Sequence, residues 1–457
     1  MPENEHTSWI HMLPAILEEL DQRILNDPAL DASVFARLIV AQRKLGLVFG
    51  DRPTCPFLRP HIIGRSQYDQ VSRAAGTIAS AIERVVALAL EDDELLAVLG
   101  PTERETRMAR IDPGYSRLCV SSRLDSYLSE SGFQFLEYNA ETPAGVGDQM
   151  QLEKVLLPMF HLQELLAQHA HWRPEPHRRL LTAIVETYRE WGGDEERPQI
   201  AIVDWKGVAT ESEFHVLREY FLAKGYPTVI ADPEELRYDG SSLSAGDFRV
   251  DVVYKRVVIH EFLERCDESH PLARAYADRR VCIINSFRTK LAHKKSSFAI
   301  LSDPRYAGLF TGEEISVFQD HIPWTRRVAS GMTSFQGEET ELMDLIRRER
   351  ERLVLKPNDD YGGHGVFIGW ETTPDEWERA IALALKRPYV VQERVQLKKT
   401  PMPMFTDRVR LEDLFVDFNP FLFDNQTEGA LIRLSPSALL NVTSGGGQTA
   451  LLVLEDM

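Results

Sequence analysis

Two short runs of this chain carry an arginine, two carboxylates and an amide at alternate positions. They are Arg123-Leu-Asp125 and Glu137-Tyr-Asn139, and the turn signal Ser131-Gly132 lies between them. A hairpin centred on Ser131 places Asp125 opposite Glu137 and Arg123 opposite Asn139, with opposed Cβ atoms about 4.5–5.5 Å apart. Residues two apart on a strand share a face, so all four side chains are expected to point the same way.

Two carboxylates and an amide oxygen held this close suit a hard cation such as Mg²⁺. Without a cation the two carboxylates would repel each other. The alternative is a solvated hairpin edge that carries these charges by chance, and the pattern alone does not separate the two interpretations.

A second segment combines a lysine with a glycine-rich turn. The apolar run 353–355 ends on Lys356, and the β-type run 366–368 follows the turn. Glycines let backbone N–H groups approach a polyphosphate, and a lysine at a strand end supplies a point charge to it. The glycines concerned are Gly362, Gly363 and Gly365. An ordinary turn without a ligand is the alternative.

Together the two segments resemble the ATP-grasp ligases, in the circularly permuted branch that includes glutathionylspermidine synthase. Arg-x-Asp followed by Glu-x-Asn resembles that family's magnesium and transition-state cluster, here Arg123, Asp125, Glu137 and Asn139. Lys356-Pro with the downstream Tyr-Gly-Gly-x-Gly is similar to its phosphate-covering hairpin. The metal ligands precede the nucleotide lysines, which is the permutation. The resemblance spans residues 115–456.

The resemblance also implies nucleotide contacts. Residues 389–395 resemble the linker strand that holds adenine, which implies contacts from Gln392, Glu393 and Val395. Residues 293–301 resemble the helix that carries the first nucleotide lysine, which implies Lys295.

Substrate contacts are expected from three further segments. Residues 250–256 and 429–433 resemble family segments, which implies Arg256 and Arg433. For Arg256 a salt bridge at the end of a buried strand is an equal alternative. The segment that follows the metal strand is expected to line the acceptor site through Glu141, Thr142 and Gly145.

The resemblance implies an ATP- and Mg²⁺-dependent ligase that joins a carboxylate to an amine through an acylphosphate. In this reading Arg123 faces the transferring phosphoryl group. A non-catalytic nucleotide- or peptide-binding protein and an ATP-dependent kinase remain as alternatives. The run Asp417-Phe-Asn419-Pro420 imitates the metal-binding end of an unpermuted family member. Too few residues separate Asp417 from Glu393 to build a catalytic sheet, so Asp417 is expected to be structural.

Composition agrees with a cytoplasmic enzyme that acts on small-molecule or peptide substrates, a carboxylate and an amine. The 457 residues are 43% hydrophobic and 27% charged, with a formal net charge of −18. That charge argues against non-specific nucleic-acid binding, which needs a basic surface. No apolar run approaches the length of a membrane helix. The four cysteines show no CxxC spacing and predict neither a zinc site nor a disulfide framework. The oligomeric state stays open.

The expected fold class is α/β or α+β, of the circularly permuted ATP-grasp type. Residues 1–110 are predicted to form a helical section, with helices at 8–25, 31–46 and 66–99. Residues 111–195 are expected to hold the metal-site strands, followed by helices at 150–170 and 176–191.

The second half of the chain is expected to divide into two further units. Residues 196–286 should form an α/β domain on the substrate side, because strands that alternate with helices imply a parallel sheet. Its strands are predicted at 198–203, 227–231, 250–254 and 281–284. Residues 287–457 should form the ATP-binding lid and the return to the central sheet, with mobile loops at 331–339 and 398–407.

Overall fold

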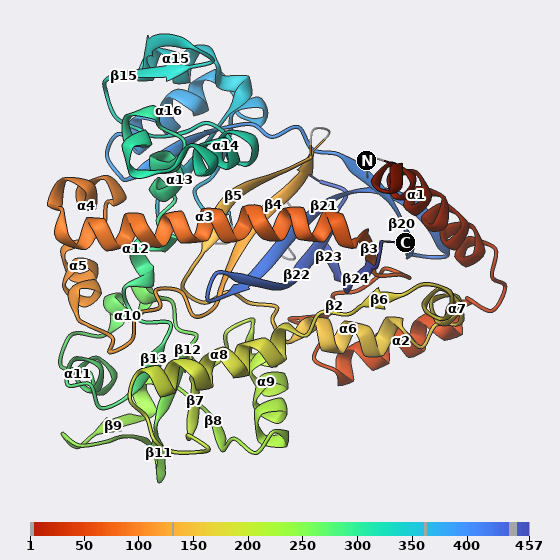
Figure 1. The fold of residues 1–457 in the computed structure, drawn as a ribbon, viewed down its shortest axis with the longest axis horizontal. Coiled ribbons are helices and arrows are strands. Elements are labelled where there is room, and N and C mark those ends of the chain that lie inside the picture. Colours follow the sequence, from red (N-terminus) through yellow and green to blue (C-terminus); the bar gives the residue numbers. More distant parts are fainter. Residues whose placement is uncertain (1–3, 130–131, 361–362, 438–445, 457) are drawn as a thin grey trace.

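The protein is described by a computed structural model covering residues 4–129, 132–360, 363–437 and 446–456. Three β-sheets position the site described below, and helices cover their outer faces (Figure 1). Among the described helices, none is long and apolar enough to cross a membrane.

The largest sheet is antiparallel and joins strands from opposite parts of the chain. Its order is β23-β22-β21-β4-β5, with β20 also paired to β21. In β4 and β5, Asp125 lies opposite Glu137 and Arg123 opposite Asn139, which confirms the predicted register. The turn residue Ser131 itself lies outside the described residues. The strands are β4 (Ser122–Ser129), β5 (Gly132–Asn139), β20 (Lys399–Phe405), β21 (Val409–Phe423), β22 (Gln426–Ser435) and β23 (Gly447–Thr449).

The second sheet is parallel, as the alternating pattern predicted. Its order is β13-β12-β7-β8, and every neighbouring pair is parallel. Its strands are fully buried or nearly so, because helices lie on both faces. The strands are β7 (Ile200–Val203), β8 (Thr228–Ala231), β12 (Val252–Lys255) and β13 (Cys282–Ile284), and the helices include α8 (Pro176–Glu190), α9 (Glu211–Ala223), α10 (Ile259–Arg265) and α11 (Pro271–Ala277).

The third sheet lies with helices α15 and α16 at the end of the view opposite to the parallel sheet, and we call it the lid sheet (Figure 1). Its order is β14-β19-β17-β18, all antiparallel. A separate core packs two helices on it through buried residues such as Ile346, Leu355 and Trp377. The elements are β14 (Thr325–Arg327), β17 (Leu353–Pro357), β18 (Phe367–Ile368), β19 (Tyr389–Glu393), α15 (Leu342–Arg348) and α16 (Pro374–Ala384).

The N-terminal section is largely helical, but it is built into the core of the rest. The predicted helix at 66–99 is two helices, because Asp92 leaves the helical conformation and caps the second one. Strand β3 (His61–Gly64) pairs in parallel with β24 (Leu451–Leu454), so the N-terminal section and the last described strand share a sheet. The helices are α1 (Asn4–Leu25), α2 (Ala32–Lys44), α3 (Arg65–Glu91), α4 (Asp93–Leu99) and α5 (Glu103–Arg110). The division at 110, 195 and 286 stays a prediction.

Two expected loops are strands. Residues 331–339 belong to the hairpin β15 (Met332–Phe335) and β16 (Glu338–Glu341), and residues 398–407 contain β20. In β20, Pro401 and Pro403 alternate with methionines along a strand that pairs within its sheet only with β21, so a missing N–H on the other side is tolerated. The expected helix at 150–170 is likewise broken in two. These helices are α6 (Asp148–Leu156) and α7 (Phe160–Gln168).

The remaining short elements connect these layers. The short strands are β1 (Val48–Phe49), β2 (Arg52–Pro53), β6 (His171–Trp172), β9 (Leu236–Tyr238), β10 (Leu243–Ala245) and β11 (Phe248–Val250). The short helices are α12 (Thr289–His293), α13 (Ser296–Leu301), α14 (Gly312–His321), η1 (Pro233–Glu235), η2 (Pro304–Leu309), η3 (Arg350–Arg352) and η4 (Gly369–Glu371).

The N-terminal section and the last described strand share one hydrophobic core. A substitution in that strand is therefore expected to lower the stability of the whole core. Leu452 of β24 is 1% exposed within the cluster that includes Ala75 and Ile82 of α3. Leu452→Ala should lower the free energy of unfolding by about 2–5 kcal/mol in urea denaturation, because it leaves a cavity. Ile39→Ala on α2, where the side chain is 39% exposed, should change it by roughly 0.5 kcal/mol or less. Equal effects of the two variants would contradict this view of the core.

Candidate active site

A cavity lies between the large sheet and the lid sheet. It encloses about 1170 Å³, part of which is open to solvent. Residues of β4, β5, β21 and β22 form one wall, and residues of β17, β18 and β19 form the other. Charged side chains from both walls meet in it: Asp125, Glu137, Lys295, Lys356, Asp360, Glu393, Arg394, Asp417 and Arg433.

A β-bulge aims the predicted metal strand into this cavity. The pairing of β4 with β5 shifts after Asp125, so that Ser126 lies opposite Phe135. The consecutive residues Leu136 and Glu137 therefore both line the cavity, although neighbours on a regular strand point to opposite faces.

The lysines and Glu137 form a compact group across the two walls. Lys295 Nζ lies 3.2 Å from a Glu137 carboxylate oxygen, and Lys356 Nζ donates to Gln392 Oε1 at 2.7 Å. Burial opposes ionisation of Glu137, but the charges of Lys295 and Lys356 outweigh it and hold its pKa below the usual range. Burial lowers the pKa of Lys356 to about 8, with Lys295 acting in the same direction and Glu137 against it.

Asp125 is held by two arginines on the face of the large sheet. Arg123 contacts both of its oxygens, at 2.7 and 3.1 Å, and also donates to the carbonyl of Ala144 at 2.9 Å. Arg433 Nη2 lies 3.0 Å from Asp125 Oδ2. Asn139 contacts Asp125 Oδ1 through its amide nitrogen at 2.9 Å. Of the four predicted cluster residues, Asp125 and Glu137 line the cavity, and Arg123 and Asn139 support Asp125.

Asp417 lines the same cavity as Asp125 and Glu137. The two metal-binding patterns found in the sequence therefore lie in one site. Strand β21 lies beside β4, and Asp417 is paired with Tyr127 on one side and Arg433 on the other. Its carboxylate accepts from Arg433 Nε at 2.7 Å, and burial raises its pKa to about 6. Asp417 thus has the structural partner expected of it, but it also lines the cavity. Its buried neighbour Asn419 has an amide nitrogen without a hydrogen-bond partner.

The expected adenine segment lies on the lid wall. Gln392, Glu393 and Val395 all line the cavity. The side chain of Glu393 pairs with Arg352 at 2.9 Å, and that of Gln392 donates to Thr325 Oγ1 at 3.0 Å. The apolar part of the lining suits a flat base: Leu136, Val354, Val366, Ile368, Trp370, Val395 and Leu397. Sequence reasoning missed Leu136 and Trp370, because neither belongs to a motif.

The two described glycines of the lid hairpin, Gly363 and Gly365, have different roles. Gly363 has a φ of 80° and lines the cavity. Gly365 has a φ of 68°, and a Cβ there would lie 2.9 Å from Pro357 Cγ, so its glycine is required by backbone conformation and close packing. Gly362 lies outside the described residues.

The residues expected at the acceptor site are mostly engaged with other parts of the protein. Glu141 accepts from the backbone N–H of Ile259 at 2.7 Å, and the backbone N–H of Gly145 donates to Glu213 at 2.9 Å. Arg256 donates to the Pro143 carbonyl at 2.7 Å and lies 3.5 Å from Glu213, which is the salt bridge of the alternative interpretation. Thr142 is half-buried beside them. Their contact with a substrate stays a prediction.

The donor set fits a magnesium ion at Asp125 and Glu137. Both carboxylates line the cavity, and they lie opposite each other on adjacent strands. The Asn419 amide nitrogen, which has no hydrogen-bond partner, is a donor and suits a phosphate oxygen rather than the ion. A metal ion bound by Asp125 would compete with Arg123 and Arg433 for the same carboxylate oxygens.

Comparisons with known proteins agree with this geometry. The family model for circularly permuted ATP-grasp type 2 matches residues 60–443. The chain belongs to this family, and the predicted fold is confirmed. A glutathione synthetase-like effector from Globodera pallida, solved in its apo form, has a TM-score of 0.58 at 13% identity and covers 94% of this chain and 98% of its own. This likeness shows the fold alone.

Two sequence relatives point in the same direction. A putative glutamate–cysteine ligase of Frankia casuarinae is 27% identical over 244 residues, which are 50% of this chain and 26% of that protein. An uncharacterised protein of Mycobacterium leprae is 23% identical over 456 residues, covering 93% of this chain and 76% of its own. This chain thus spans about a quarter of the first relative's length.

The charges around Lys356 predict an unusual titration. A lysine with a pKa of about 8 loses its proton as the pH rises through 8, where ordinary lysines stay charged. Labelling by acetic anhydride, followed by mass spectrometry relative to the exposed Lys386, should therefore reach half its maximum at about pH 8. Glu137→Gln should move this midpoint to lower pH, because Glu137 favours the charged lysine.

The exposed Glu339 supplies a matched control. Glu339→Gln should leave the Lys356 midpoint in place. A midpoint near that of ordinary lysines, or one indifferent to Glu137→Gln, would show that the two walls do not meet as described.

Proposed function

We propose that the protein is an ATP- and Mg²⁺-dependent ligase that joins a carboxylate to an amine through an acylphosphate. The observation that carries this proposal is the cavity between the two sheets. In it Lys295 and Lys356 face Asp125 and Glu137, and an apolar wall suitable for a nucleotide base lies beside them.

The reaction requires activation of a carboxylate, because a carboxylate oxygen is a poor leaving group. Transfer of the γ-phosphoryl group to the acid makes an acylphosphate, which the amine then attacks with loss of phosphate. Mg²⁺, when bound, would offset charge on the phosphates. Lys295 and Lys356 bind the phosphates, and the amide of Gly363 adds a neutral donor.

The arginines stabilise charge that develops during transfer. Arg433 lines the cavity between Asp125 and Asp417, whereas Arg123 does not line it and acts through Asp125, whose carboxylate it holds. A preorganised guanidinium directed at the transferring phosphoryl group stabilises the transition state more than the ground state. Because their carboxylate partners fix both arginines, little reorganisation is needed when that charge appears.

The substrate class is also part of this proposal, and its support comes from a relative's name. The name of the glutamate–cysteine ligase of Frankia casuarinae favours an amino acid or short peptide as the acid or amine. The narrower resemblance to glutathionylspermidine synthase stays a prediction, as does a location in the cytoplasm.

The decisive experiment is a phosphate-release screen with ATP and Mg²⁺ over crossed panels of amino acids, peptides and polyamines. A ligase releases phosphate only when acid and amine are both present, and its product has the summed mass less one water. A phosphorylated product without an amine would identify a kinase. ATP binding with no turnover in any combination would identify a binding protein.

Arg123 should act in turnover more than in nucleotide affinity. Arg123→Ala is expected to lower kcat by roughly two to three orders of magnitude while the Kd for ATP changes little. Lys356→Ala should weaken ATP binding by about 1.5–3 kcal/mol in calorimetry, because it removes a charged partner. The exposed Arg178 supplies a control, and Arg178→Ala should leave both quantities in place. Full turnover in Arg123→Ala would remove Arg123 from the mechanism.

The carboxylates should act through the metal. Asp125→Ala or Glu137→Ala should raise the Mg²⁺ concentration needed for half-maximal turnover, with partial recovery at high Mg²⁺. The measurement is a magnesium titration of ATP turnover for each variant. Unchanged magnesium dependence in both variants, with a changed one in Asp417→Ala, would move the metal to β21.

A further inference from the structure

A buried cluster of alternating charges lies next to the cavity. Lys290 Nζ contacts Glu141 at 2.7 Å and Asp359 at 2.6 Å. Lys294 Nζ contacts Asp359 at 2.5 Å and Glu105 at 2.8 Å. Both lysines are 2% exposed or less. We call these five residues the lysine cluster.

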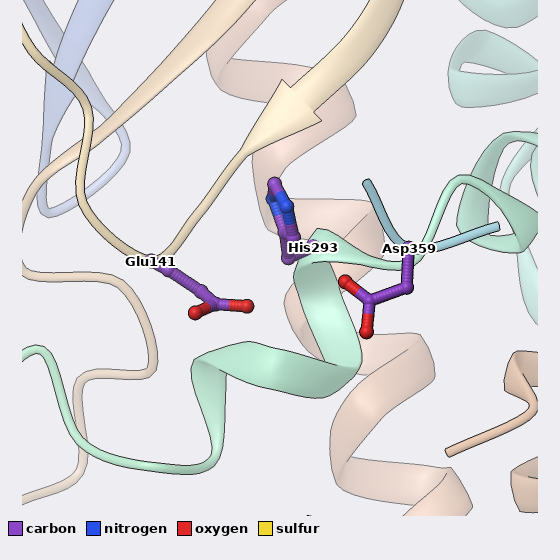
Figure 2. Close-up of side chains that lie close together, drawn as sticks. All are labelled: Glu141, His293 and Asp359. Carbon is purple, nitrogen blue, oxygen red and sulfur yellow. The ribbon is translucent and has the colours of Figure 1, made fainter. Parts of the chain in front are cut away.

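Three members of this region have the composition of a metal site. Among the described residues, Glu141, His293 and Asp359 offer ligand atoms that all lie within 4.8 Å of one another. Figure 2 shows the Glu141 and Asp359 carboxylates turned toward each other, with His293 close to both. The ammonium of Lys290, however, contacts both carboxylates and supplies the positive charge that an ion would bring. Burial lowers the pKa of His293, whose Nδ1 lies 3.2 Å from the Tyr138 carbonyl.

The lysine cluster joins two parts of the chain that build the site to the helix α5. Glu141 follows the metal strand β5, Asp359 follows β17 and Lys356, and Glu105 lies on α5. Only three peptide units separate Lys356 from Asp359, which is about 10 Å of extended chain. Fixing Asp359 therefore restricts where the phosphate-facing lysine and the glycine turn can lie relative to Glu137.

Backbone hydrogen bonds hold the same segment in place. The N–H of Lys295 donates to the Asn358 carbonyl at 2.9 Å, and the N–H of Ser296 donates to Asn358 Oδ1 at 2.8 Å. Lys295 Nζ also donates to the Asp360 carbonyl at 2.8 Å. The start of the glycine turn is thus docked on the junction of α12 and α13, from which Lys295 reaches the cavity.

We propose that Asp359 is a positioning residue, anchored by Lys290 and Lys294, that fixes the glycine-rich hairpin over the phosphate-binding part of the cavity. This proposal rests on the proposed function. Removing the Asp359 charge would take one carboxylate partner from each of two buried ammonium groups. Breaking a buried ion pair in this way is strongly destabilising, because a buried charge is left without compensation. The hairpin would then lose its fixed place, while strands β17 and β19 would keep their packing in the core of the lid sheet.

Nucleotide affinities separate this role from a general loss of structure. Asp359→Asn should raise the Kd for ATP by about tenfold or more, since phosphate contacts are charge-assisted and depend on the hairpin. The Kd for adenosine, which has no phosphates, should change by less than about twofold. Hydrogen exchange of residues 363–368 should become faster, because the hairpin opens more often. Both affinities can be measured by calorimetry.

Asp21 supplies a matched control. It forms a buried ion pair with Arg59 at 2.6 Å on the N-terminal side of the molecule. Asp21→Asn should lower thermal stability but leave the ratio of the two affinities and the exchange of residues 363–368 unchanged. If Asp359→Asn does not fold, Lys294→Gln serves in its place, because it removes one anchor and leaves Lys290 paired. The double variant Asp359→Asn/Lys294→Gln should weaken ATP binding little further than the more severe single variant, since both act on one contact.

The outcomes separate this proposal from the proposed function. If the unaltered protein does not bind ATP, the proposed function fails, and hydrogen exchange alone still tests the anchor. If it binds ATP and Asp359→Asn leaves both affinity and exchange unchanged, the anchor fails. Equal losses for ATP and adenosine would show general damage and overturn the positioning role. A stoichiometric metal in the purified protein that is lost in His293→Ala would replace the lysine cluster with a metal site.

Discussion

The site depends on holding opposite charges from two separate sheets face to face in a partly buried cavity. Lys295 is buried there, and the side chains of Lys356 and Glu137 are only partly exposed. Opposite charges stabilise one another in such a place, since an isolated buried charge is costly. The base of the lid sheet is docked where Lys295 meets both Glu137 and the start of the glycine turn.

The large sheet brings charged residues from distant parts of the chain into one cavity. Antiparallel pairing places β4 beside β21, so Asp125 and Asp417 reach one cavity although they come from distant parts of the chain. Arg433 between them prevents two carboxylates from repelling each other. The order of segments along the chain matters little to such a sheet. What matters is which residues share a face, and a permuted chain can therefore retain the same site.

The sequence predicted what depends on local periodicity. The β4–β5 register followed from a two-residue repeat on either side of a turn, and the parallel sheet followed from alternating strands and helices. Long-range contacts were beyond its reach. The pairing of β4 with β21 and the joining of β3 to β24 both depend on partners far along the chain. The bulge at Leu136 and the β20–β21 hairpin are local, but no turn or periodicity signal marked them. The break at Asp92 carried a local signal, a capping residue before an acidic turn, which a continuous apolar pattern obscured.

The same limit applies to the charges. Sequence spacing brought Asp125 and Glu137 together but gave no sign that Arg123 and Arg433 would both contact Asp125. Among the residues that line the cavity, four cations (Lys295, Lys356, Arg394 and Arg433) face five carboxylates (Asp125, Glu137, Asp360, Glu393 and Asp417). Such a set cannot balance a triphosphate, which carries several negative charges. A divalent cation entering with the nucleotide would reduce that imbalance, and Asp125 and Glu137 are the carboxylates placed to receive it. The electrostatics of the cavity therefore favour a metal–nucleotide complex over the nucleotide alone.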